Sequence, residues 1–175
     1  MNKKKIHAVI LARGGSKGIK NKNLILINGK PLIYWSIKRC LESEKISNTW
    51  VSSDNKKILN ISEKFGAQII KRPKKLATDK SSSDMAWHHA IKYIKKIDNV
   101  NYIVGVQPTS PIRGKKDFDN AIKKQFYKKY DSLFSATDFE TFFTWKVKNK
   151  KVKSNYNLKK RPRRQNLKKT ILENG

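Results

Sequence analysis

Apolar segments of strand length alternate with segments of helical period along most of this chain, which is typical of a parallel sheet with crossover helices. The Asn28-Gly29 turn signal and candidate helix caps at Asp54 and Ser83 separate some of these segments. The pattern predicts an α/β domain with a mostly parallel sheet and helices on both faces. The expected strands are residues 7–11, 49–52, 67–70, 102–106 and 132–136, and the expected helices are residues 31–41, 55–65, 84–97 and 116–126.

Loops that follow the strands of an open α/β sheet gather at its carboxyl edge, where ligands bind. The loops at residues 12–23, 52–54 and 107–113 should therefore converge at this edge.

The alternation ends near residue 140, and a basic tail follows. Between Lys146 and Gly175 there are twelve basic residues and one acid. Phe142, Phe143 and Trp145 are too apolar for a free tail, so an arm that packs on another subunit is expected. We therefore predict an α/β domain at residues 1–140, an extended basic dimerisation arm at 141–170, and the start of a returning core strand at 171–175 that looks truncated.

Length, charge and cysteine content limit the class of protein. The chain has 175 residues, a single cysteine at position 40 and no apolar run near the ~18 residues of a membrane span. A soluble, cytoplasmic protein with no membrane partner is expected. The formal charge is +28, but 34 of the 41 basic residues are Lys, which resembles a coding bias more than an Arg-rich nucleic-acid interface. Anionic small molecules are the expected partners, and a basic nucleic-acid-binding module remains the alternative.

The loop after the first expected strand has the residues that a triphosphate requires. Its glycines allow backbone N–H groups to approach phosphate oxygens, and Arg13, Lys17 and Lys22 supply positive charge. The spacing matches neither a Walker A loop nor a dinucleotide-binding Gly-x-Gly-x-x-Gly, so kinase and dehydrogenase functions are weakened. A flexible, Lys-rich loop without a ligand is the simpler alternative.

Several separated motifs match a known family in order, over nearly the whole chain. The matching segments are residues 13–17, 22–23, 29–32, 51–54, 72–73, 76–79 with 81–83, 107–113, 163–165 and 173–175. In these segments the sequence resembles the acylneuraminate cytidylyltransferases, the CMP-sialic acid synthetases.

The resemblance implies a Rossmann-like nucleotidyltransferase that joins CTP to the anomeric hydroxyl of a nonulosonic acid and releases pyrophosphate. It also implies that Lys22, Arg13 and Lys17 stabilise charge on the reacting phosphates and that Arg164, delivered by a partner subunit, meets the sugar carboxylate. It assigns CTP to Arg13, Gly14, Gly15, Ser16, Lys17, Lys22, Asn23, Arg72, Ser81, Ser82 and Ser83, and the sugar acid to Gln107, Thr109, Ser110, Arg164, Gln165 and Asn174.

Simpler structural roles compete with some of these assignments. Asp54 and Ser83 can act only as helix caps. His88 and His89 are adjacent on a helix and point about a quarter-turn apart, so packing or exposure explains them better than a paired ligand set. Cys40 has no activating neighbour and is expected in the core.

The metal expected for this chemistry is Mg²⁺, and the resemblance places its aspartate ligands beyond residue 175, with none within this chain. The related KDO-type enzymes carry Gln-Gly-Asp-Glu-Pro, where this chain has Thr109 in place of the acid, which favours the sialate branch. A folded nucleotide-binding domain with low or absent activity is therefore expected, unless the missing part is supplied by another chain. A non-catalytic remnant that only dimerises is a further alternative. The sequence does not distinguish among N-acetylneuraminate, legionaminate and pseudaminate as the acid.

Overall fold

The computed structural model describes residues 4–139, 145–149, 151–160, 162–163 and 170–173. The chain divides into two compact units, Met1–Leu133 and Phe134–Gly175. The predicted dimerising role of residues 141–170 stays a prediction.

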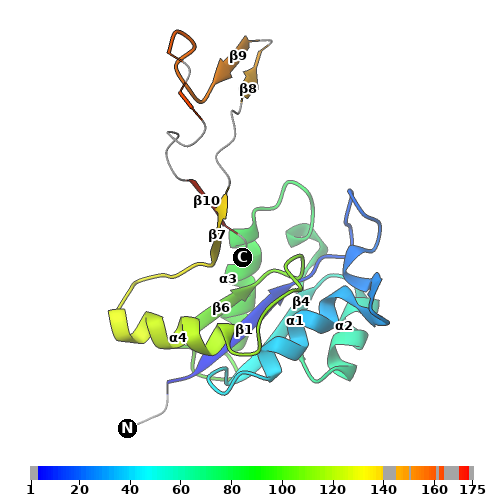
Figure 1. Cartoon of the computed structure of the whole chain (residues 1–175). Coiled ribbons are helices and arrows are strands. Elements are labelled where there is room, and N and C mark those ends of the chain that lie inside the picture. Colours follow the sequence, from blue (N-terminus) through cyan, green and yellow to red (C-terminus); the bar gives the residue numbers. More distant parts are fainter. Residues whose placement is uncertain (1–3, 140–144, 150, 161, 164–169, 174–175) are drawn as a thin grey trace. The chain divides into compact units, whose positions relative to one another are not determined.

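The first unit contains a four-stranded parallel sheet (Figure 1). Its spatial order is β5-β4-β1-β6, so the chain moves outward from β1 and then crosses to the other side of β1. The carboxyl ends of β1 and β6 therefore flank the point where the strand order reverses, which is the usual ligand position in such sheets. The strands are β1 Ile6–Leu11, β4 Asn48–Ser53, β5 Gln68–Lys71 and β6 Tyr102–Val106.

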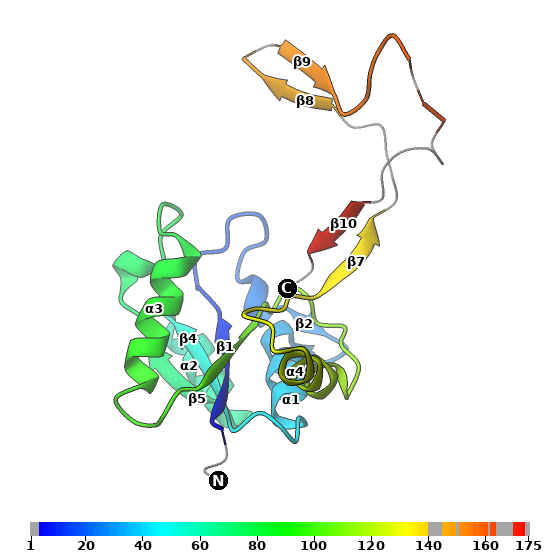
Figure 2. The same cartoon turned by 90° about the vertical axis from the view of Figure 1, so that its left-hand side faces the viewer.

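Helices cover both faces of this sheet, as the sequence predicted: α3 lies on one face and α1 and α4 on the other (Figure 2). Side chains of β1 alternate between two cores, because successive residues of a strand point to opposite faces. Ala8 and Ile10 pack with α1 and α2, whereas Val9 packs with Ala90 and Ile94 of α3. The helices are α1 Leu32–Leu41, α2 Lys56–Lys64, α3 Ser83–Ile94 and α4 Asp117–Lys128.

Cys40 lies in the core of the α1 face, where it is 1% exposed. Burial raises the pKa of its thiol to about 12, although the positive charge of Arg113 lowers it. The thiol therefore stays protonated and packs as a small apolar side chain, which confirms the expected core position.

Two predicted helix caps were wrong by one residue. Asn55, not Asp54, caps α2, because its side-chain oxygen accepts from the backbone N–H groups of Lys57 and Ile58. Ser82, not Ser83, caps α3 by accepting from the backbone N–H of Met85. The carboxylate of Asp54 is thereby available for another partner.

Shorter elements connect the main ones. A hairpin joins β2 Leu26–Ile27 to β3 Lys30–Pro31, and its turn residues Asn28 and Gly29 both have positive φ, as a tight hairpin turn requires. Before it lies the 3-10 helix η1, Lys22–Leu24, and after β5 lies η2, Lys74–Leu76.

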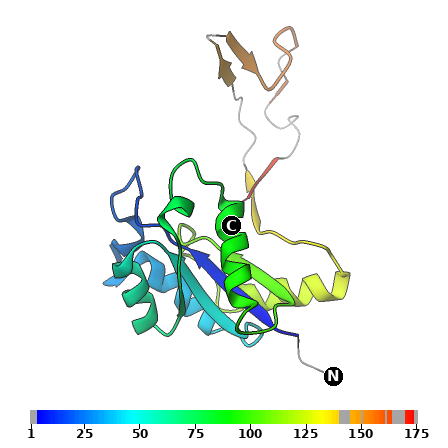
Figure 3. The ribbon, with the colours of Figure 1, turned by 180° about the vertical axis from the view of Figure 1, so that it is seen from behind.

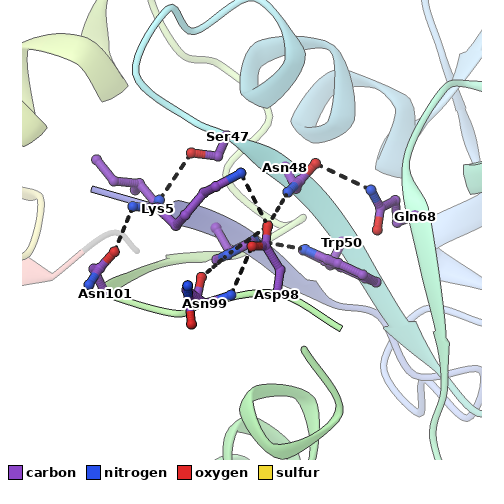
Figure 4. A network of polar contacts seen from close by, with 10 residues as sticks. Lys5, Ser47, Asn48, Trp50, Gln68, Asp98, Asn99 and Asn101 are labelled. Atoms are coloured by element: carbon purple, nitrogen blue, oxygen red, sulfur yellow. Dashed lines mark hydrogen bonds and ion pairs between the residues drawn. The ribbon is translucent and has the colours of Figure 1, made fainter. Parts of the chain in front are cut away.

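A network of polar contacts holds the amino edge of the sheet (Figure 4). The indole N–H of Trp50 donates to Nδ1 of His7, so the ring proton lies on Nε2, which donates to the carbonyl of Asn99 at 2.9 Å. Asp98 accepts from Asn48 and pairs with Lys5 at 3.5 Å. These contacts join the loop before β6 to β1 and β4 at the edge opposite the strands' carboxyl ends.

The second unit contains two antiparallel strand pairs. β7 Ala136–Phe139 pairs with β10 Thr170–Glu173, and β8 Trp145–Lys148 pairs with β9 Lys151–Ser154. The strand predicted at residues 132–136 was misplaced, because the observed strand starts at Ala136 and pairs with β10 instead of joining the parallel sheet. Phe142 and Phe143 lie outside the described residues.

Within the described ranges, no helix has the length and apolar character needed to cross a membrane.

Candidate functional site

Loops that follow the four parallel strands lie at the carboxyl edge of the sheet. The loop after β1 and the loop after β5 both project beyond this edge (Figure 3). The loop after β1 also meets the end of β4, because the backbone N–H of Gly14 donates to Oδ1 of Asp54 at 2.9 Å. The convergence predicted for the loops at 12–23 and 52–54 is therefore confirmed.

Three contacts fix the base of the loop after β1. Besides the Gly14–Asp54 bond, the N–H of Ala12 donates to the carbonyl of Ser52, and the amide of Asn23 donates to the carbonyl of Arg13 at 3.1 Å. Gly14 packs so closely that an added Cβ would lie 2.8 Å from Cβ and Nδ2 of Asn55, whereas Gly15 and Gly18 have open space. The loop therefore has a fixed base and an exposed Gly15–Lys20 portion that is half-buried only at Ser16.

Two cations of this loop share one carboxylate of the loop after β5. Nη1 of Arg13 lies 2.9 Å from Oδ1 of Asp79, and Nζ of Lys17 lies 2.8 Å from Oδ2. The hydrogen bond from Lys17 is the largest cause of the lowered pKa of Asp79. Burial raises this pKa, and the hydrogen bond and charge of Arg13 lower it further. Asp79 lies within a matching motif, but no local pattern pairs it with residues more than sixty positions away.

Arg72 directly follows β5 and is 5% exposed. Its Nε and Nη2 have no hydrogen-bond partner among the described residues. Burial lowers the pKa of its guanidinium, the charge of Asp54 raises it, and the charge of Arg13 lowers it further. Charges from two other loops thus act on Arg72 at this edge.

His89 of α3, like Arg72, has a buried nitrogen without a hydrogen-bond partner among the described residues. Its Nδ1 is buried and has no partner among the described residues, as is also true of the hydroxyl of Ser52 at the end of β4. Burial lowers the pKa of His89, and the nearby charge of Arg72 lowers it further. Buried polar atoms normally have hydrogen-bond partners. The unpartnered atoms of Arg72, His89 and Ser52 are therefore candidate positions for hydrogen bonds to a ligand. Packing or exposure was expected for His89 from the sequence, and no pattern related it to Arg72.

The serines before α3 have mostly structural partners. The hydroxyl of Ser81 donates to the carbonyl of Lys75 and lies 2.7 Å from that of Thr78, and Ser82 caps the helix. Ser83 is exposed as the first residue of α3. Nucleotide contacts of these serines stay a prediction.

The loop after β6 is held from the side of α1. Arg113 donates through Nη2 to the carbonyl of Gln107 at 2.9 Å and through Nη1 to Ser36 of α1. Its guanidinium lies 5.7 Å from the ring centroid of Phe118. Gln107 and Thr109 are exposed, and Ser110 is half-buried. Arg113 was noted in the sequence as part of a motif, but its anchoring contacts could not be read from it.

Of the remaining predicted site residues, only Lys22 lies within the described part of the chain. Lys22 begins η1 and is half-buried. Arg164, Gln165 and Asn174 lie outside the described residues.

Carboxylates near the loop do not make a metal site. In the part of the chain that the structure describes, no three His, Cys, Asp or Glu side chains are grouped to hold a metal ion. Asp54 accepts from Gly14, and Asp79 pairs with two cations. The described residues therefore supply no three-ligand cluster, and both acids beside the loop already have protein partners.

A family model described as cytidylyltransferase matches residues 7–173. The chain belongs to the cytidylyltransferase family. This result and the relatives below confirm the resemblance found in the motifs. N-acylneuraminate cytidylyltransferase A of Danio rerio is 35% identical over an alignment of 175 positions, which covers 97% of this chain and 40% of the relative. Pseudaminic acid cytidylyltransferase of Campylobacter jejuni (strain 81-176) is 35% identical over 134 residues, which are 75% of this chain and 58% of the relative.

The fold agrees with this family. A solved CMP:2-keto-3-deoxy-manno-octonic acid synthetase, complexed with CTP, superposes with a TM-score of 0.67 at 20% identity, over 98% of this chain and 72% of that chain. The predicted Rossmann-like nucleotidyltransferase fold is thereby confirmed. The cytidylyltransferase-family chain spans less than two thirds of the length of the two curated relatives named above.

Proposed function

We propose that this protein transfers the cytidylyl group of CTP to the anomeric hydroxyl of a nonulosonic acid and releases pyrophosphate. The observation that carries the proposal is the fixed loop after β1, which presents Arg13 and Lys17 at the carboxyl edge of the sheet beside buried Arg72. The names of the relatives support CTP and a sugar acid of this class as substrates.

In this reaction the sugar hydroxyl oxygen forms a bond to the α-phosphorus and loses its proton, while the bond from that phosphorus to the bridging oxygen breaks. Positioning and electrostatic stabilisation carry most of such a transfer. The loop at residues 13–17 would hold the β- and γ-phosphates, and Lys22 would stabilise charge at the α-phosphate. Asn23 would act mainly through the loop, because its amide already holds the carbonyl of Arg13.

Arg72 is suited to the cytosine, because its unpartnered N–H groups can donate to the acceptors of the base. Gln107 is suited to the sugar acid, because Arg113 fixes its backbone while its side chain is exposed. Ser81, Ser82, Ser83, Thr109 and Ser110 keep their proposed substrate-binding roles from the family motifs.

Three further features belong to the proposal. The sugar carboxylate would meet Arg164 of an arm contributed by a second subunit, which makes the protein a homodimer. Mg²⁺ would be held by the triphosphate and water, as the family resemblance implies for this reaction. A cytoplasmic location rests on the single cysteine.

The test measures pyrophosphate release by the purified chain with CTP, Mg²⁺ and a panel of N-acetylneuraminate, legionaminate and pseudaminate. Release with one acid would establish the reaction and identify the substrate. Binding is followed in parallel by thermal unfolding with CTP or ATP. Stabilisation that is equal for both nucleotides and disappears at moderate salt would contradict the proposal and favour a general polyanion site.

Lys22→Ala tests the transition-state role, with Lys20→Ala as the matched control. Both lysines lie in the same loop region, and Lys20 is exposed. We expect Lys22→Ala to lower kcat by about 100-fold or more with a much smaller change in the Kd of CTP, because a group that acts in the transition state affects turnover most. Equal effects of Lys22→Ala on kcat and on CTP binding would contradict this role.

A further inference from the structure

One carboxylate holds two cations of the loop after β1, Arg13 and Lys17. Each oxygen of Asp79 contacts a different cation, Arg13 or Lys17, at distances below 3 Å. The three side chains are between 37% and 78% exposed, so all of them are accessible to a dissolved ligand. Asp79 comes from the loop after β5, and the ion pairs therefore join two loops that are separate in the sequence.

The sequence around Asp79 makes this contact specific. Asp79 is the only acid between residues 72 and 82, a segment that also carries Arg72, Lys74, Lys75 and Lys80. The loop after β1 and the loop after β5 are both basic apart from Asp79. Attraction between a basic loop and a generally acidic surface therefore does not explain why Arg13 and Lys17 pair with Asp79. The carboxylate presents two oxygens to an Arg and a Lys, as a phosphate group does.

We propose that Asp79 occupies, in the ligand-free protein, the position that phosphate oxygens take on Arg13 and Lys17. Pyrophosphate and the β- and γ-phosphates of a triphosphate then bind in competition with this internal carboxylate. Ligands that do not use these two cations, such as CMP, bind without displacing it. The CTP part of this inference rests on the proposed function, whereas the pyrophosphate part rests only on the ion pairs.

Removal of Asp79 should therefore strengthen pyrophosphate binding, whereas removal of an ordinary binding residue weakens it. Replacing Asp79 with Asn removes the competitor but keeps the size of the side chain. Exposed ion pairs contribute up to about a fivefold factor each, so the Kd of pyrophosphate should fall by roughly three- to twentyfold. The Kd of CTP should fall by a similar factor, and the Kd of CMP should change by less than about twofold.

The experiment measures the binding of inorganic pyrophosphate, CTP and CMP to the full chain by calorimetry, in wild type and three variants. Asp84→Asn is the matched control, because Asp84 lies in the exposed first turn of α3 and makes the same change of net charge. Asp79→Glu keeps the charge and should keep pyrophosphate affinity near that of wild type.

The outcomes separate this inference from the proposed function. Tighter pyrophosphate binding by Asp79→Asn alone supports the inference, even if no variant binds CTP in preference to ATP and the proposed function fails. Weaker or unchanged pyrophosphate binding by Asp79→Asn overturns it, because Asp79 would then only position the cations, and this holds even if CTP binds wild type as proposed. An equal gain in Asp84→Asn also overturns it, since net charge would then be the cause.

Discussion

Gly14 offers a sharp test of how the loop after β1 is fixed. Alanine at this position would place a Cβ 2.8 Å from both Cβ and Nδ2 of Asn55. Ordinary contact begins at 3.4 Å, so either the loop or Asn55 must move by about 0.6 Å. Movement of Asn55 weakens the cap of α2, and movement of the loop lengthens the 2.9 Å bond from Gly14 to Asp54.

The size of the effect follows from these two contacts. Loss of an N-cap costs about 1 kcal/mol, and loss of a hydrogen bond to a charged group costs about 1.5–3 kcal/mol. Partial loss of one of them predicts that Gly14→Ala lowers the free energy of unfolding by about 1–2 kcal/mol. For a chain of this length, that corresponds to a Tm lower by roughly 2–8 °C.

Thermal unfolding of Gly14→Ala and Gly15→Ala measures this effect. Gly15 is the control because a Cβ there would meet nothing within 4 Å, and neither glycine has a positive φ. Both variants restrict the unfolded chain equally, so the difference between them reports the clash alone. Equal Tm values for the two variants would refute the close packing of Gly14 on Asn55.

Three further predictions concern other parts of the first unit. Asp119 is buried and accepts hydrogen bonds from the hydroxyl of Ser43 and from two backbone N–H groups. Burial raises the pKa of Asp119, but these hydrogen bonds hold it below its ordinary value. Asp119→Ala should therefore cost about 2–3 kcal/mol by urea unfolding at pH 7, and the difference from wild type should shrink as the pH falls below about 4, since the carboxylate contribution is lost on protonation. Arg113→Ala should raise KM for the sugar acid severalfold in steady-state assays while the Kd of CTP stays within about twofold of wild type, because the released loop carries Gln107; an equal change in CTP binding would contradict this. His89 has a pKa below its ordinary value, so the unfolded state takes up its proton first and stability should fall as the pH drops below about 6.5; His89→Gln should flatten this part of a Tm-against-pH curve, and an unchanged curve would show that His89 is not the group.

The parallel sheet was predictable because buried strands give continuous apolar runs between helical segments. β6 was predicted with its observed bounds, and β1 differs by one residue. The cap of α2 could not be assigned from the sequence, because Asp54 and Asn55 are both good capping residues. They are distinguished only by Gly14, which packs on Asn55 and whose backbone N–H donates to Asp54. Local patterns contain no such information.

Long-range pairing limited the rest of the prediction. β7 pairs with β10, which begins more than thirty residues later, so its local sequence did not fix its start. The ion pairs of Asp79 with Arg13 and Lys17 also join distant segments. For the candidate site, the sequence identified the loop and its cations, whereas the contacts that hold them required the structure.

At the amino edge of the parallel sheet, a network of polar contacts joins three segments, although Oγ1 of Thr49 has no partner among the described residues. This network predicts unequal rates of amide hydrogen exchange at the two edges. At the amino edge, His7, Trp50 and Asp98 bond to one another's segments, so the amides of β1 and β4 there should open only with global unfolding. At the carboxyl edge, Arg72 and His89 keep unsatisfied atoms, and the neighbouring loops should exchange through smaller local openings. A bound nucleotide should slow amide exchange at the carboxyl edge alone. Ligand-binding loops could then change conformation at this edge while the contacts at the amino edge keep the fold intact.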